Sequence, residues 1–177
     1  MTTLPESPCW LTVSSIAIEQ GDLLLGCEMP RVPAAAFDRS ASTPEISLEE
    51  IDTIVLTQTC QIEHGKLKNV VVCRVVTVSQ FNQGHDGRTG KDFWSNVRSG
   101  RDDRLHLLHP PSGSSAFLDL LVVDFREIFT PPLTYLHTFA NSKHRSRLQS
   151  PHLEHLAQRF GHYFAKVALP IELPKHP

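Results

Sequence analysis

Cys60 is the residue of this chain whose type and position best suit covalent chemistry. It stands where a strand that begins at Ile51 is expected to end in solvent. A cysteine nucleophile needs a cation or a base that favours its thiolate, and His64 and Lys66 lie in the turn that should follow. With Asp22 to orient the imidazole, Cys60, His64 and Asp22 would form the catalytic group of a thiol-dependent hydrolase.

A binding surface is the second interpretation of the same stretch. Gln61 follows Cys60 and can hydrogen-bond, but it carries no charge that would stabilise an imidazolium. A third, structural interpretation makes Cys60 a small buried side chain, as free cysteines usually are. Under the binding interpretation the polar contacts come from Thr57, Gln58, Thr59, Gln61 and Lys66.

Two apolar runs flank this site and predict a central hairpin. Residues 54–56 and 70–72 are too short and too rich in β-branched side chains to form helices. Between them, residues 63–66 place a glycine among charged neighbours, as hairpin loops do. Continuous apolar runs are typical of strands buried on both faces, so the hairpin should lie at the centre of its sheet.

The remaining chain predicts further short strands and one long final helix. Ser150 followed by Pro151 suits a helix start, and the helix should run to about Ala168. Strands are expected at residues 11–18, 23–25, 105–108 and 117–123, short helices at 47–50, 89–99 and 133–140, and loops at 31–44, 79–88 and 141–149.

This order of elements predicts an α+β fold. The expected architecture is a small, antiparallel, strongly bent β-barrel, SH3-like or PemK-like, with short helices and a long C-terminal helix. Residues 1–10 are expected to be a mobile segment, residues 11–170 a single domain, and residues 171–177 a tail.

The final helix should present two different faces. At about 100° per residue, one side gathers apolar side chains and should pack on the sheet. The other side is a basic stripe that could bind nucleic acid or an acidic protein partner. We favour a solvated face as its explanation, because neutral histidines add no charge at pH 7. The apolar side holds Leu153, Leu156, Phe160, Phe164 and Val167; the stripe holds His152, His155, Arg159, His162 and Lys166.

Composition limits the possible functions. A net charge of −2 argues against a general polyanion binder. Four cysteines without CxxC spacing, and a start that lacks a signal peptide, predict a cytoplasmic protein with reduced thiols.

No apolar run suits a membrane span and no Gly-rich phosphate loop is present, so neither a membrane nor a cofactor is expected. The spacing of His152 and His155 could bring two metal ligands together, but no carboxylate or thiol stands with them, so no metal site is predicted.

Several motifs together resemble a set of small, mostly uncharacterised bacterial proteins. The matching parts are Gly21-Asp22, VLTQTC at residues 55–60, VDFR at 123–126 and the stretch from Pro151 to Pro170. The last of these is similar to the family's ending PYREHLSQAFARFFMRVGLP. The resemblance covers most of the chain and implies no particular activity. The chain departs from it at Gln61, where the family has Asp, and at Ala168, where it has Gly.

A looser resemblance connects the early Gly-Asp turn and the two apolar strands to the SH3-like barrel of PemK/MazF-type toxins. It implies a ribonuclease, but those enzymes carry an arginine just before their central strand, where Asp52 stands here. We therefore predict a non-enzymatic binding module for protein or nucleic acid, of open oligomeric state. The alternative is an enzyme, either a thiol-dependent hydrolase centred on Cys60 or a PemK-like ribonuclease.

Overall fold

The structure is a computed structural model, and it describes residues 9–37, 46–84, 89–112, 119–141 and 144–165. The strands are β1 (Trp10–Val13), β2 (Asp22–Arg31), β3 (Ser47–Val55), β4 (Val72–Thr77), β5 (Leu105–Leu108), β6 (Leu121–Phe129) and β7 (Arg145–Leu148). The helices are α1 (Thr59–Glu63), α2 (Val78–Gly84), α3 (Lys91–Arg98), α4 (Leu133–Ala140) and α5 (His152–Phe164), with a 3-10 turn, η1 (Ala34–Phe37).

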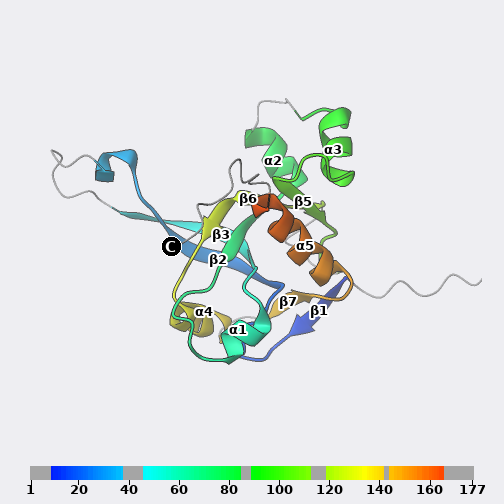
Figure 1. Cartoon of the computed structure of the whole chain (residues 1–177). Helices are drawn as coiled ribbons and strands as arrows, with labels where there is room; N and C mark the ends of the chain where they lie inside the picture. The colour runs from blue at the N-terminus through cyan, green and yellow to red at the C-terminus, as the bar shows by residue number, and fades with distance from the viewer. Residues whose placement is uncertain (1–8, 38–45, 85–88, 113–118, 142–143, 166–177) are drawn as a thin grey trace, which may run out of the picture.

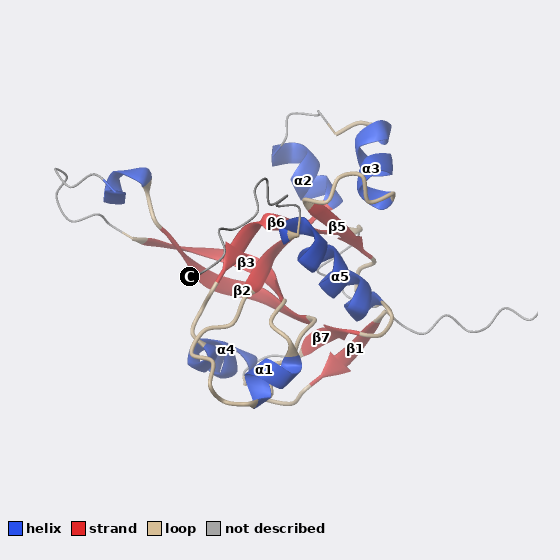
Figure 2. Ribbon diagram, in the orientation of Figure 1, coloured by secondary structure: helices blue, strands red, loops and turns tan. Residues whose placement is uncertain are grey.

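Within these residues the strands form one seven-stranded antiparallel sheet in the order β1-β7-β2-β3-β4-β6-β5 (Figures 1 and 2). The α+β class and the C-terminal helix are therefore confirmed. The barrel is wrong, because β1 and β5 remain at opposite edges and do not pair with each other. A sheet closes into a barrel only when its first and last strands meet.

The predicted central pair is confirmed, but its hairpin turn is wrong. β3 lies between β2 and β4, and Val55 pairs with Val72. The first strand ends at Val55 rather than at Cys60, and residues 56–71 contain the short helix α1. The helical turn buries Ile62 against the core, which an open hairpin loop could not do.

Three other local predictions are wrong for reasons of tertiary packing. Residues 47–50 continue β3, because they pair with residues 28–31 of β2. Residues 78–84 form α2 because Phe81 packs into a small cluster with Val97. The basic stretch before Ser150 contains β7, which is held between β1 and β2.

Each face of the sheet is covered by a different helix. α5 lies across one face, where Leu156 packs with Phe125 and Ile54 in the largest hydrophobic cluster (Figure 1). α4 supplies Leu136 to the cluster on the other face. Both leucines are almost completely buried, so each helix is held by its apolar stripe.

Most of the core that the sequence predicts is buried. The predicted core residues are Ile54, Leu56, Val70, Val72, Leu120, Val122, Phe160 and Phe164. Phe160 is half-buried and packs against Phe125, with ring centroids 5.6 Å apart. Phe164 is wrong as a core residue, because 54% of its surface is exposed at the end of α5. Leu120 is only half-buried. The residues confirmed as buried are Ile54, Leu56, Val70, Val72 and Val122. Val167 and the predicted end of the helix at Ala168 lie outside the described residues.

Phe160→Ala should destabilise the protein, because it removes the ring that packs on Phe125. A loss of about 3 kcal/mol in the free energy of unfolding is expected for a large aromatic side chain at such a contact. Phe164→Ala makes the same chemical change one turn later on the same helix, and should cost less than about 1 kcal/mol because Phe164 is exposed. Chemical denaturation of both variants measures the difference, and equal losses would contradict this docking of α5.

Candidate functional site

Two threonines of the predicted site lock the backbone rather than face a ligand. The Val71 N–H donates to Thr57 Oγ1 at 2.7 Å, which ties the two ends of the connection between β3 and β4. The Gln20 N–H donates to Thr59 Oγ1 at 3.1 Å, and Gln20 Nε2 donates to the carbonyl of Leu56. These contacts fix α1 against the turn that precedes β2.

The polar and nucleophilic members of the predicted site lie on the surface and do not converge. Cys60 is exposed, and its thiol donates to Gln58 Oε1 at 3.9 Å. Cys60 and His64 meet through their backbones, where the His64 N–H donates to the Cys60 carbonyl at 3.2 Å. The interpretation of Cys60 as a buried apolar side chain is therefore wrong. Gln58, Gln61, His64 and Lys66 are exposed as well.

Asp22 occupies a different environment from the one that a catalytic carboxylate would need. Its side chain is completely buried and accepts from Arg145 Nε at 2.8 Å and from Arg147 Nε at 2.5 Å. The Glu19 N–H donates to the same carboxylate at 3.0 Å. Two guanidinium groups and a backbone amide thus occupy its oxygens, and the structure does not pair it with His64.

The arginines that hold Asp22 also hold the connection between β1 and β2. Arg145, itself buried, donates to the Ser15 carbonyl at 2.6 Å and to the Ala17 carbonyl. A buried guanidinium needs partners for its donors, and these carbonyls supply them. We call Asp22, Arg145 and Arg147 the Asp22 cluster. Its contacts are those of a structural support.

The stripe on α5 is not one exposed basic face. Arg159 is half-buried, and its guanidinium donates to the carbonyls of Gly100, Asp102 and Leu105. These bonds connect α5 to the turn between α3 and β5, which leaves the group less free to bind a phosphate. His155 and His162 are exposed, His152 is half-buried, and Lys166 lies outside the described residues.

A buried histidine, His106, lies beneath α5, and the sequence did not predict its burial. His106 on β5 is only 6% exposed, and its ring meets the His155 ring edge-on with centroids 5.0 Å apart. Burial, together with the nearby His155, Arg159 and His152, lowers the pKa of His106 to about 3. His106 is therefore neutral at physiological pH and acts as an aromatic core side chain.

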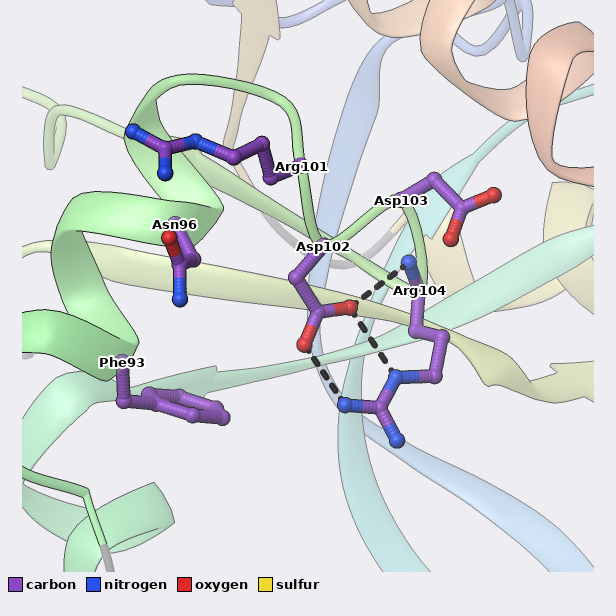
Figure 3. Close-up of a pocket in the computed structure, with 6 residues that line it drawn as sticks. All are labelled: Phe93, Asn96, Arg101, Asp102, Asp103 and Arg104. Atoms are coloured by element: carbon purple, nitrogen blue, oxygen red, sulfur yellow. Dashed lines mark hydrogen bonds and ion pairs between the residues drawn. The ribbon is translucent and has the colours of Figure 1, made fainter.

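A hollow of about 530 Å³ lies between α3 and the turn before β5, and it contains paired charges (Figure 3). Asp102 accepts from Arg104 through both carboxylate oxygens, at 2.9 and 2.6 Å. Hydrogen bonding from Arg104 lowers the pKa of Asp102, so the pair is ionised over the physiological range. Arg101 and Asp103 also line the hollow, so its lining carries two charges of each sign and offers no strong electrostatic attraction to a charged ligand.

A second hollow, of about 620 Å³, is lined mostly by apolar groups. It lies where β2 and β3 meet the end of β6 and the start of α4, and we call it the base hollow. Tyr135 on one of its walls accepts a hydrogen bond from the Glu28 N–H at 2.8 Å. The other principal lining residues are Met29, Leu48, Ile128, Phe129 and Pro131.

Beyond the base hollow, β2 and β3 leave the sheet as a projecting ribbon that carries η1 (Figures 1 and 2). We call residues 27–37 and 46–51 the arm. Four of the seven exposed large hydrophobic side chains in the described part of the protein belong to it. They are Val32, Phe37, Ile46 and Leu48, with 50%, 79%, 58% and 62% of their surfaces exposed.

The sequence prediction missed the arm because its residues were divided between a loop and a helical turn. Two signals were present: the apolar residues Val32 and Phe37 within a Pro- and Ala-rich stretch, and the alternation of Ile46 and Leu48 with polar residues. Alternation predicts a strand, but Ser47 with Glu50 also matches a helix-capping pattern. Pairing with β2 decides between the two.

Asp22→Ala should destabilise the protein strongly, because it leaves the buried Arg145 guanidinium without its anion. Breaking a buried ion pair from one side typically costs about 3–5 kcal/mol. Glu19→Ala is the matched control: its carboxylate pairs with Arg147 but is partly exposed, so the cost should stay below about 1 kcal/mol. Urea denaturation of both variants checks this, and similar losses would refute the role of the Asp22 cluster.

Removing His106 should make the protein less sensitive to acid. In the unfolded chain a histidine binds its proton near pH 6.5, whereas folded His106 does so only near pH 3. As pH falls through this window the unfolded state gains the proton, so folded-state stability should fall by up to about 1.4 kcal/mol per pH unit. In thermal denaturation from pH 7 to pH 4, the stability of His106→Leu should therefore depend less on pH than that of the wild type. His162→Leu changes an exposed imidazole and should show the pH dependence of the wild type.

The described residues contain no group of three or more His, Cys, Asp and Glu side chains that could hold a metal ion. No described helix is long and apolar enough to cross a membrane. In comparisons with known proteins, no family model matches this chain and no curated protein sequence matches it significantly.

Proposed function

We propose that this protein is a non-enzymatic protein-binding module and that the arm is its binding element. The observation that carries the proposal is the concentration of exposed apolar side chains on one projecting ribbon. Scattered single apolar residues are normal on a protein surface, but a group of them on one element is typical of an interaction site.

The backbone of the arm supports the same conclusion. From Cys27 outward β2 pairs only with β3, and the pairing of β3 with β4 begins at Asp52. Both edges of the outer ribbon therefore lack a neighbouring strand among the described residues, and at its base the Glu28 N–H donates to Tyr135 instead. Unpaired strand edges accept strands from other chains, and a two-stranded ribbon alone is only marginally stable in water.

Ion pairs hold the arm in its projecting position. Glu49 accepts from Arg31 on the neighbouring strand and lies 3.1 Å from Arg74 on β4. Hydrogen bonding from Arg31 lowers the pKa of Glu49, so these charges persist at neutral pH. The ribbon therefore already has an ordered conformation before a partner binds, which reduces the conformational entropy lost on association.

The partner that best fits the arm is a second copy of this chain. Each copy carries an apolar arm tip and, at the base of the arm, an apolar hollow of about 620 Å³. Two identical arms that lie antiparallel about a two-fold axis bring each tip to the base of the other, which is the reciprocity of a symmetric dimer.

Energetics also favour the reciprocal arrangement. Burying one large apolar side chain contributes about 1.5–3 kcal/mol. Leu48 lines the base hollow, so three such side chains of one arm remain, Val32, Phe37 and Ile46. They contribute at most about 5–9 kcal/mol, which is comparable with the cost of association of about 4–15 kcal/mol. Two arms double the gain for a single association, so exchange between two copies is favourable where a one-sided contact is weak.

Sedimentation velocity tests the proposal. The wild-type chain should form a dimer, and Val32→Asp with Phe37→Asp at the arm tip should give monomers, because a carboxylate cannot enter the apolar hollow. Leu11→Asp with Ile16→Asp changes two exposed apolar residues outside the arm and should leave the dimer intact.

A mixing experiment identifies the two surfaces. Thr130→Arg fills the base hollow with a charged side chain and should also give monomers. A mixture of the tip variant with Thr130→Arg retains one intact tip and one intact hollow per heterodimer, so dimer should partly return. A wild-type monomer at all concentrations, or a tip variant that remains dimeric, would refute self-association through the arm.

A further inference from the structure

Cys9 and His152 form a thiol–imidazole pair that the sequence does not suggest. Cys9 Sγ and His152 Nε2 are 3.2 Å apart, although the residues are 143 positions apart in the chain. This is within the distance at which an imidazole accepts the proton of a nucleophile. Both residues are half-buried, so the thiol is sheltered but not enclosed.

The sheet brings the two side chains together. β1 pairs with β7 through Trp10 and Leu148, and the Gln149 N–H donates to the Cys9 carbonyl at 2.8 Å, which extends that ladder by one step. α5 begins at His152, shortly after this pairing ends. The position of the pair is therefore set by backbone contacts on both sides and does not depend on a mobile turn.

The Cys9 thiol faces an imidazole at the start of a helix. His152 is the first residue of α5, and the N-terminus of a helix carries partial positive charge. His155 follows one turn later. The acidic residue of this turn, Glu154, accepts a hydrogen bond from Ser150 Oγ at 2.9 Å. A neighbouring imidazole and a helix N-terminus are two of the features that distinguish reactive cysteines from inert ones.

We propose that Cys9 is a redox-modification site that exchanges with low-molecular-weight disulfides. His152 accepts the thiol proton, and the Cys9 thiolate attacks one sulfur of the disulfide. A new S–S bond forms at Cys9 while the bond of the small disulfide breaks, and the released thiolate takes the proton held by His152. Atoms and electrons balance without any further oxidant, because the disulfide itself is the oxidant.

The other cysteines supply controls within the same molecule. Cys60 is more exposed than Cys9 but has no imidazole bonded to its sulfur, so it represents an ordinary accessible thiol. Cys27 is buried. Cys73 is buried as well; burial raises its pKa, and its thiol donates to the Asp124 carbonyl at 2.8 Å. If solvent access alone determines the rate of reaction, Cys60 should react fastest. If activation by an imidazole determines it, Cys9 should react fastest.

The expected direction of the rate difference follows from general thiol chemistry. An ordinary thiol is only about 1% ionised at pH 6.5, so a neighbouring imidazole that accepts the thiol proton has most to add at that pH. The lower nucleophilicity of a more readily formed thiolate offsets part of the gain in rate. The advantage should shrink at pH 8.5, where an ordinary thiol is half ionised.

The test uses the full chain under native conditions with limiting glutathione disulfide, and peptide mapping by mass spectrometry locates the adduct. At pH 6.5, Cys9 should react severalfold faster than Cys60, and the ratio should fall at pH 8.5. His152→Ala should remove this advantage, whereas His155→Ala should retain it. His64→Ala should leave the rate at Cys60 unchanged.

Two results would overturn the proposal. One is a Cys9 rate at pH 6.5 that does not exceed the Cys60 rate in the wild-type chain. The other is a rate advantage that persists in folded His152→Ala, as judged by circular dichroism. If His152→Ala does not fold, the ratio of the two wild-type rates between pH 6.5 and pH 8.5 decides the question alone.

Discussion

The buried carboxylate of Asp22 is the contact on which three strands and a long connection depend. Asp22 begins β2, Arg145 and Arg147 belong to β7, and the same guanidinium groups hold carbonyls between β1 and β2. Replacing a buried ion pair by apolar groups can be neutral for stability. Apolar side chains could not satisfy the carbonyls of Ser15 and Ala17, however, so here the charges determine the path of the backbone.

The helix α5 adds a second set of constraints through a similar use of charge. Its apolar stripe covers the sheet, while Arg159 satisfies three carbonyls of the turn between α3 and β5. A residue that looked like a cation for a ligand thus completes the hydrogen bonding of a turn. His106 is covered by the same helix, and burial keeps it neutral. Arg159 and His106 thus make their contacts within the protein. The projecting arm, by contrast, exposes four large apolar side chains to water.

The two proposals concern opposite parts of the molecule and rest on different physical quantities. The arm is proposed as a binding element because of apolar area that water does not solvate well. Cys9 is proposed as a reactive thiol because of the distance between a sulfur and a nitrogen. Neither proposal assigns a role to the exposed Cys60, whose thiol donates to Gln58 rather than to a histidine.

Local patterns in the sequence determined the α+β class, the central pair of strands, α4, β5 and the docking stripe of α5. These predictions succeed because β-branched runs and a 3.6-residue apolar period act over a few neighbouring residues. Tertiary structure alone decided that residues 47–50 extend a strand, that the sheet stays open, and that Asp22 pairs with two arginines more than 120 positions away. The pairing of Cys9 with His152 belongs to the same class, because the two residues meet only after β1 has paired with β7. Such contacts depend on strand order and register, which no local pattern encodes.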